Sequence, residues 1–470
     1  MEAIPSRWKG WQEWYGQHDQ FQHAHGPPPC ARRKCRSRRH DRQAARFAPN
    51  GVEHQARSVP RCRARPNRSE FCVPPLSSWL HTRRQEGASC DRNQRQARYR
   101  RPLPQGLIPP VSTDPAHPQH AAHAAALTSR AHLSSLAPDR VPADLSIALA
   151  AARAAARAVQ ALGDPQLFAA GSVIDKGVAG PATVADIASQ VAATITLRHA
   201  YGDSVRIVAE ESLEEVEALG GDSLLALVAT AVCAAGIDCD VTTARAALAG
   251  SADHGGTGTF WAIDPLDGTK GYLRGGQFAI AIALVVDGQP IVGVLGLPRL
   301  SAVGNGTDPV TGGAGVLAAA VAGGGAVQTP IDHWAPTRID AYQWSMGDPL
   351  RLAGSVERGH SASESLESRA AALGVVEPVR VDSQAKYALV ARGDADAYLR
   401  LSPTPDYREC LWDHAAGALV AVEAGCIVTD SRGIAMDFST GRRLTQSQGV
   451  ICAPPRLHAE LVAALAPLVR

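Results

Sequence analysis

The chain has 470 residues and a formal net charge of +2, but this charge is unevenly distributed. Residues 1–140 hold 24 Lys and Arg against 10 Asp and Glu, whereas the remaining residues hold 23 against 35. No run of 18 or more apolar residues occurs and no signal peptide opens the chain, so we expect a soluble, non-secreted protein with no membrane partner.

Residues 1–140 are rich in Arg, Pro, Gln and His and show no sustained apolar period. Such a segment cannot bury enough apolar surface to offset chain entropy, and we predict that it is disordered. Its basic charge would suit nucleic acid. We favour an organelle-targeting leader (chloroplast or mitochondrion) or a stretch that is not a real domain, because no folded nucleic-acid module accompanies the charge. Without targeting, the expected compartment is the cytoplasm, and no nucleic-acid partner is expected for the folded part.

Residues 141–470 carry the periodic patterns of a folded region. The Ala-rich stretch 143–162 contains neither Gly nor Pro and predicts a helix. The turn residues at 287–290 separate two apolar runs and predict a hairpin. Mixed sheets layered with helices, the α+β class, are the architecture that this order favours. The other predicted elements are an extended segment at 181–186, a helix to about residue 199, strands at 205–209, 260–263, 278–286 and 291–297, and after them helices at 364–373, 385–391 and 412–424 and strands at 379–381, 397–401 and 426–429.

Acidic side chains end or follow several of these apolar strands, where a carboxylate has no packing role. Pro265 fixes φ and forces a turn after strand 260–263, which brings Asp264, Asp267 and the Leu266 carbonyl to one point. Carboxylates and a carbonyl are the hard oxygen ligands that Mg²⁺ prefers, and Mg²⁺ keeps waters that can act as nucleophiles. The residues that carry this chemistry are Asp186, Glu210, Glu211, Asp264, Asp267, Thr269 and Asp413.

The stretch 268–271, Gly-Thr-Lys-Gly, offers free backbone amides that form a seat for a phosphate oxygen. A metal pair beside such a seat is what phosphate-ester hydrolysis needs. Each motif also has a plainer interpretation, because Asp-Pro-x-Asp-Gly is common turn chemistry, Glu210-Glu211 suits a solvated loop and Asp413 suits a helix N-cap. The conjunction of all of them in this order favours a catalytic site.

These motifs resemble the inositol monophosphatase superfamily of metal-dependent, lithium-sensitive phosphatases, and within it the 3′(2′),5′-bisphosphate nucleotidase branch. The resemblance covers about residues 141–470 and no part of 1–140. The matching stretches are Pro181 to Asp186 with Gln190, Val208 to Ser212, Trp261 to Gln277, Asp382 to Tyr387, and Trp412 to Gly417 with Glu423 to Gly425.

The resemblance implies a layered αβαβα fold, with metals held between a half at 141–335 and a nucleotide-binding half at 336–470. It implies Mg²⁺ as cofactor and a small adenosine bisphosphate as substrate, so that 3′-phosphoadenosine 5′-phosphate yields AMP and phosphate, with 3′-phosphoadenosine 5′-phosphosulfate as a further candidate. By position it implies Glu210, Asp264, Leu266 through its carbonyl, Asp267 and Asp413 as metal ligands. Asp186 and Thr269 would orient and deprotonate water, with Glu210 completing the catalytic set. The implied substrate seat consists of Gly268, Thr269, His360, Ser361, Ser383, Lys386 and Arg400.

Lys386 and Arg400 discriminate between the open alternatives. A bisphosphate nucleotide needs a second cationic seat, whereas an inositol phosphate 1-phosphatase does not. Without the motifs, these two residues would be interpreted as a surface pair. The alternative of another class is a catalytically weak nucleotide-sensing protein, and the intact set of five ligand positions argues against it. The chain departs from the branch pattern at 177–181, Leu297, Arg299 and Cys426, none of which removes a ligand, so we expect activity.

Overall fold

The computed structural model describes residues 140–163, 173–175, 181–302, 313–356 and 370–468, apart from 372, 375, 403 and 405. The predicted leader, except for Arg140, lies outside the described residues, and so does most of the predicted helix at 364–373. The prediction of a disordered leader therefore stays a prediction.

The first half of the folded region is built on a seven-stranded mixed sheet, in the order β3-β4-β5-β6-β7-β8-β9. Strands β3 and β4 are parallel and the other neighbours are antiparallel. The predicted hairpin is formed by β5 and β6. The bounds are β3 Ile207–Ala209, β4 Thr259–Asp267, β5 Ala279–Val286, β6 Gln289–Leu297, β7 Val316–Val321, β8 Gly325–Pro330 and β9 Thr337–Ile339.

The second half is built on a five-stranded sheet, in the order β11-β10-β12-β14-β13. Strand β10 is parallel to both of its neighbours, and β14 is antiparallel to both of its own. The chain leaves the first sheet after β9, and the predicted division at residue 335 stays a prediction. The bounds are β10 Leu350–Gly354, β11 Val376–Arg380, β12 Ala397–Arg400, β13 Ile427–Thr429 and β14 Val450–Ala453, with a separate antiparallel pair formed by β1 Val173–Asp175 and β2 Pro181–Thr183.

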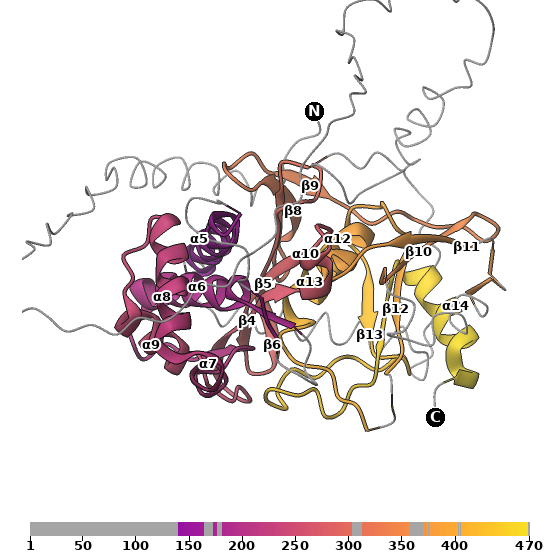
Figure 1. The fold of residues 1–470 in the computed structure, drawn as a ribbon. Coiled ribbons are helices and arrows are strands. Elements are labelled where there is room, and N and C mark those ends of the chain that lie inside the picture. The colour runs from indigo at the N-terminus through magenta and orange to yellow at the C-terminus, as the bar shows by residue number, and fades with distance from the viewer. Residues whose placement is uncertain are drawn as a thin grey trace, which may run out of the picture. The chain divides into compact units, whose positions relative to one another are not determined.

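Helices cover both sheets and separate them (Figure 1). Helices α5 and α6 pack on one face of the seven-stranded sheet, α12 and α13 lie between the sheets, and α14 packs against β14. The predicted αβαβα layering is thereby confirmed. The bounds are α5 Arg140–Ala161, α6 Val184–Tyr201, α7 Leu213–Leu219, α8 Gly221–Ala234, α9 Val241–Ala249, α10 Thr269–Leu273, α12 Ala385–Ala391, α13 Ala415–Glu423, α14 Pro455–Leu465 and a 3₁₀ turn at Ala466–Leu468.

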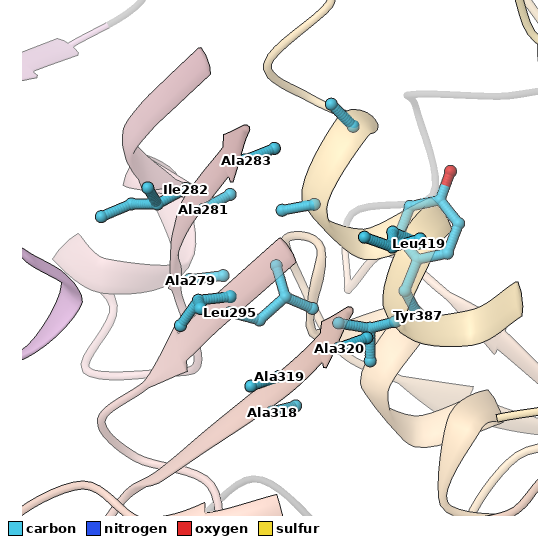
Figure 2. Close-up of a cluster of buried hydrophobic side chains, with 14 of the residues drawn as sticks. Ala279, Ala281, Ile282, Ala283, Leu295, Ala318, Ala319, Ala320, Tyr387 and Leu419 are labelled. Atoms are coloured by element: carbon cyan, nitrogen blue, oxygen red, sulfur yellow. The ribbon is translucent and has the colours of Figure 1, made fainter. Parts of the chain in front are cut away.

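Small side chains allow α13 to lie close to the seven-stranded sheet. Alanines alternate with larger residues along β5, and Figure 2 shows Ala281 and Ala283 pointing toward the helix that carries Leu419, while Ile282 points away from it. A Cβ added to Gly293 on β6 would come within 2.9 Å of the Ala416 carbonyl oxygen. Helix α13, between the two sheets, is therefore held at a fixed distance from the seven-stranded sheet, which positions the residues at its start.

Among the described residues, no single helix has the length and apolar character that crossing a membrane requires. Helices α7 and α8 meet the requirement only when counted together, and they are bent by 112° at their junction.

Candidate active site

The end of β4 brings acidic residues from two parallel strands together. Ala209 of β3 lies opposite Ile263 of β4, so Glu210 and Asp264 are the next residues along both strands. Strand β4 then makes an irregular step against β5, where the two residues between Asp264 and Asp267 face a single residue between Ala281 and Ala279. Pro265 lies within this bulge, where its missing N–H costs no regular ladder bond. The bulge keeps Asp264, Asp267 and the Leu266 carbonyl at one end of the sheet.

Thr269 connects this strand end with helix α6. Its Oγ1 lies 3.3 Å from Asp186 Oδ1 and 3.3 Å from the Leu266 carbonyl oxygen. Asp186 is in the first turn of α6 and is 2% exposed. Gly268 has φ +88°, a left-handed conformation that favours glycine, and this turn places Thr269 at the start of α10.

Gln384, before helix α12, links the second half to the same point. Its backbone N–H donates to Asp267 Oδ2 at 2.5 Å, and its side-chain Nε2 donates to the Trp412 carbonyl at 2.9 Å. Trp412 immediately precedes Asp413, so one residue fixes a β4 carboxylate and the backbone that carries Asp413. Helix α13 begins at Ala415, three residues later than predicted, and Asp413 therefore lies in the turn before the helix.

The acids in this cluster oppose one another's ionisation. Burial raises the pKa of Asp264 well above its ordinary value, and the charges of Glu210, Asp267, Asp413 and Asp186 raise it further. Burial also raises the pKa of Asp267, against the opposing charge of Lys386. For Asp413, burial raises the pKa to about 6. So many like charges in a buried place call for a cation.

The donor set fits a divalent cation. Asp264 is only 2% exposed, and among the described residues its Oδ1 has no hydrogen-bond partner. A buried carboxylate oxygen without a partner is costly unless a cation satisfies it. Carboxylates and a carbonyl are the ligand types of Mg²⁺ and Ca²⁺.

Lys386 and Arg400 lie beside the acids, and Lys386 is not a surface residue. The Lys386 side chain is 6% exposed, with its Nζ 5.4 Å from the centre of the Tyr398 ring. Burial lowers the pKa of Lys386 to about 8, while the charge of Asp267 acts in the opposite direction. Ser383, which has φ +72°, lies in the loop just before α12, the helix that carries Lys386. The seat residues His360 and Ser361 lie outside the described residues.

A buried hydrogen-bond network, missed in the sequence, supports Arg400 and the start of α13. Glu409 is fully buried, and its Oε2 lies 3.2 Å from Arg400 Nη2 and 3.3 Å from His414 Nε2. The other ring nitrogen of His414 is 2.9 Å from the Tyr387 hydroxyl. The only sequence signal was an acid close to the Trp412-Asp413 motif, which spacing alone could not interpret.

Ligand atoms of Glu409, Asp413 and His414 also lie within 4.8 Å of one another, a spacing that a metal site would allow. The Arg400 guanidinium already neutralises Glu409 at this point. We therefore interpret Glu409 and His414 as a hydrogen-bonded support and Asp413 as the member shared with the acidic cluster.

Known proteins are similar to this chain over its folded region. The sequence pattern of the inositol monophosphatase family matches residues 143–469. The chain belongs to this family. Its relatives in the family include a 3′(2′),5′-bisphosphate nucleotidase of Oryza sativa, 36% identical over 359 residues that make up 72% of this chain and 98% of the rice protein. A protein of the same name from Emericella nidulans is 42% identical over 237 residues, 47% of this chain and 66% of the relative. The crystal structure of the extragenic suppressor protein suhB from Bartonella henselae is 21% identical, with a TM-score of 0.47 over 70% of this chain and 100% of that one.

Arg299, where the chain departs from the pattern of the nucleotidase branch, has a structural role. Its guanidinium lies 5.3 Å from the ring centres of both Tyr272 and Phe278. Its Nη1 donates to the Gly276 carbonyl at 2.6 Å. Arg299 thus holds the loop after α10, close to the Gly268-Thr269 turn, and this departure leaves the acidic cluster intact.

Proposed function

We propose that the chain is a Mg²⁺-dependent phosphatase that converts 3′-phosphoadenosine 5′-phosphate to AMP and phosphate, with 3′-phosphoadenosine 5′-phosphosulfate as a further substrate. The observation that carries the proposal is an acidic cluster at the end of β4, with Asp186 and Asp264 buried and the other acids half-buried, beside the buried cation of Lys386. The names of the rice and Emericella relatives support the choice of a bisphosphate nucleotide.

The residues that would hold Mg²⁺ are Glu210, Asp264, Asp267, Asp413 and the Leu266 carbonyl. The chemistry that bound Mg²⁺ supplies is activation of water and stabilisation of the leaving oxygen. The orphaned Asp264 Oδ1 and the raised pKa of Asp264 both support a cation at this place. The protein itself contributes the fixed positions of these oxygens, which come from both halves of the fold.

Thr269 and Asp186 can move the proton of the attacking water. Both oxygens near the Thr269 hydroxyl, on Asp186 and Leu266, are acceptors, so its hydrogen is directed to one of them. A lone pair of Oγ1 is then free to accept a hydrogen bond from water. As water attacks phosphorus, its proton passes to Thr269 while the Thr269 proton passes to Asp186. The bond between phosphorus and the ribose 3′-oxygen breaks, and the 3′-oxygen takes a proton from solvent to become the 3′-hydroxyl of AMP.

The second phosphate would be held by Lys386 and Arg400, with Ser383, His360 and Ser361 completing that seat, whereas Gly268 and Thr269 would receive the phosphate that is removed. The Arg400 guanidinium is paired with Glu409 and 30% of its side chain is exposed, so it is oriented and still accessible. A planar guanidinium and an ammonium together suit a phosphate dianion. An inositol monophosphate would leave this seat empty.

The test is phosphate release by the full chain from 3′-phosphoadenosine 5′-phosphate, adenosine 3′-phosphate and inositol 1-phosphate. We expect the bisphosphate to have the highest kcat/KM by at least about tenfold, because a charge-assisted pair contributes roughly 1.5–3 kcal/mol. Preference for inositol 1-phosphate would overturn the substrate assignment and leave a phosphatase. No release from any of them would favour a nucleotide-sensing role.

A further inference from the structure

The segment 437–444, between β13 and β14, crosses from the second half to the first sheet. A Cβ on Gly288, in the β5–β6 turn, would lie 2.6 Å from the Ser439 Cβ. A Cβ on Gly441 would lie 3.1 Å from the His254 carbonyl oxygen, which belongs to the chain just before β4. These close approaches show that the segment is packed directly against the β5–β6 turn and the chain before β4, at the end of the sheet opposite the acidic cluster.

The same segment also runs beside the stretch that leads to Asp413. The Leu411 N–H donates to the Arg442 carbonyl at 3.0 Å, and the Leu444 N–H donates to the Glu409 carbonyl at 2.9 Å. Cys410 and Arg443 form an antiparallel bridge between these bonds. Arg442 therefore lies in a short backbone ladder beside one part of the acidic cluster.

The Arg442 side chain reaches the part of the acidic cluster that contains Glu210. Its Nη2 donates to the Ala209 carbonyl at 2.8 Å, and Ala209 immediately precedes Glu210. Its guanidinium carbon lies 4.5 Å from the centre of the Trp412 ring, and Trp412 immediately precedes Asp413. One planar cation thus contacts Ala209, the residue before Glu210 of the first half, and Trp412, the residue before Asp413 of the second half.

We propose that Arg442 is a positioning residue that sets the placement of Glu210 relative to Asp413 and thereby the affinity of the acidic cluster for a divalent cation. The inference rests on the proposed metal-dependent function. Groups that hold the ligands of a metal without touching it commonly change metal affinity by about 10- to 100-fold when removed. Arg442 has the right partners for this role because it holds one backbone carbonyl by a hydrogen bond and one indole ring by stacking.

The test measures Mn²⁺ binding to the metal-free full chain by titration calorimetry or electron paramagnetic resonance, with thermal unfolding recorded for each variant. Arg442→Met keeps the aliphatic stem and removes the guanidinium. Arg443→Met is the matched control, since Arg443 is the next residue and its guanidinium donates to Cys410 Sγ and the Arg408 carbonyl, both in the second half. Arg442→Lys keeps the charge but loses the planar group.

We expect the dissociation constant for Mn²⁺ to rise by about 10- to 100-fold in Arg442→Met and by less in Arg442→Lys. Arg443→Met should stay within about twofold of wild type. If Arg442→Met does not fold, Arg442→Lys decides, and unchanged affinity in that folded variant overturns the inference. Equal affinities of Arg442→Met and Arg443→Met overturn the inference and leave the proposed function standing. A wild-type chain that binds no Mn²⁺ overturns the metal site itself, and the inference with it.

Discussion

The acids around Asp264 make the metal-free protein sensitive to pH. Asp264 is buried, and four neighbouring carboxylates add to the cost of its charge. Asp413 differs from Asp264 because the charges of His414 and Arg400 oppose the upward pKa shift caused by its burial. A cation bound among these acids would remove the repulsion, so the folded state should be most strained when metal is absent and pH is high.

We expect Asp413→Asn to be more stable than wild type in excess chelator at about pH 7.5. The pKa of Asp413 rises from 3.8 to about 6 on folding, so its ionisation costs nothing below the lower value and its full amount above the upper value. The stability advantage of the variant should therefore shrink as the pH is lowered to about 4.5. Thermal unfolding at the two pH values checks this expectation. A difference that does not change with pH would contradict it, and added Mg²⁺ should favour wild type instead.

Lys386 gives a second pH dependence, which concerns the binding of substrate. Its pKa is lowered to about 8 by burial, so its charge is lost as the pH rises through that value. We expect kcat/KM for 3′-phosphoadenosine 5′-phosphate to fall above about pH 8, because this parameter reports the free enzyme. Lys386→Arg should move the fall to higher pH, since guanidinium stays charged. The same fall in Lys386→Arg, or with adenosine 3′-phosphate, would assign it to another group.

Elements with one clear periodicity could be predicted from the sequence, and others could not. The Gly-free and Pro-free run 143–161 within α5 and the turn between β5 and β6 gave unambiguous patterns. Only one residue separates α7 from α8 and six separate α8 from α9. Half of β7 is alanine, which favours helices and is depleted in strands. Their form depends on packing against neighbours that are distant in sequence.

Helix α13 depends on glycine to fit between the sheets. A Cβ on Gly417 would overlap the ring of Tyr387 on α12. Gly→Ala in a helix interior ordinarily stabilises by about 1 kcal/mol. Here the cost of the overlap with Tyr387 should exceed this gain in helix propensity. We expect Gly417→Ala to lower the free energy of unfolding by about 1–3 kcal/mol.

The matched control is Val422→Ala in the same helix, where the side chain is 39% exposed, and it should stay within about 0.5 kcal/mol of wild type. Urea unfolding measures both variants. A stabilised Gly417→Ala protein would mean that α12 and α13 can separate without loss, contrary to the packing described.

Across the whole chain, the acids of the site could be predicted from the sequence, but the residues that hold the acids in place could not. Asp264 and Asp267 could be predicted because Pro265 forces a local turn, and the geometry of such a turn depends on residues that are adjacent in the sequence. Glu409 and Arg442 could not, since their roles depend on contacts with Arg400 and Ala209 that only the folded chain creates. The residue-level roles and the targeting of the leader stay predictions.

We propose that the acidic cluster between the two halves removes the 3′-phosphate of an adenosine bisphosphate. The most direct test identifies the products made from 3′-phosphoadenosine 5′-phosphate by the full chain, with Mg²⁺ or with excess chelator, and by Asp264→Asn. We expect adenosine 5′-phosphate and phosphate in equal amounts, only with Mg²⁺ and only from wild type. Adenosine 3′-phosphate as the product, or release that persists in chelator or in Asp264→Asn, would contradict the account.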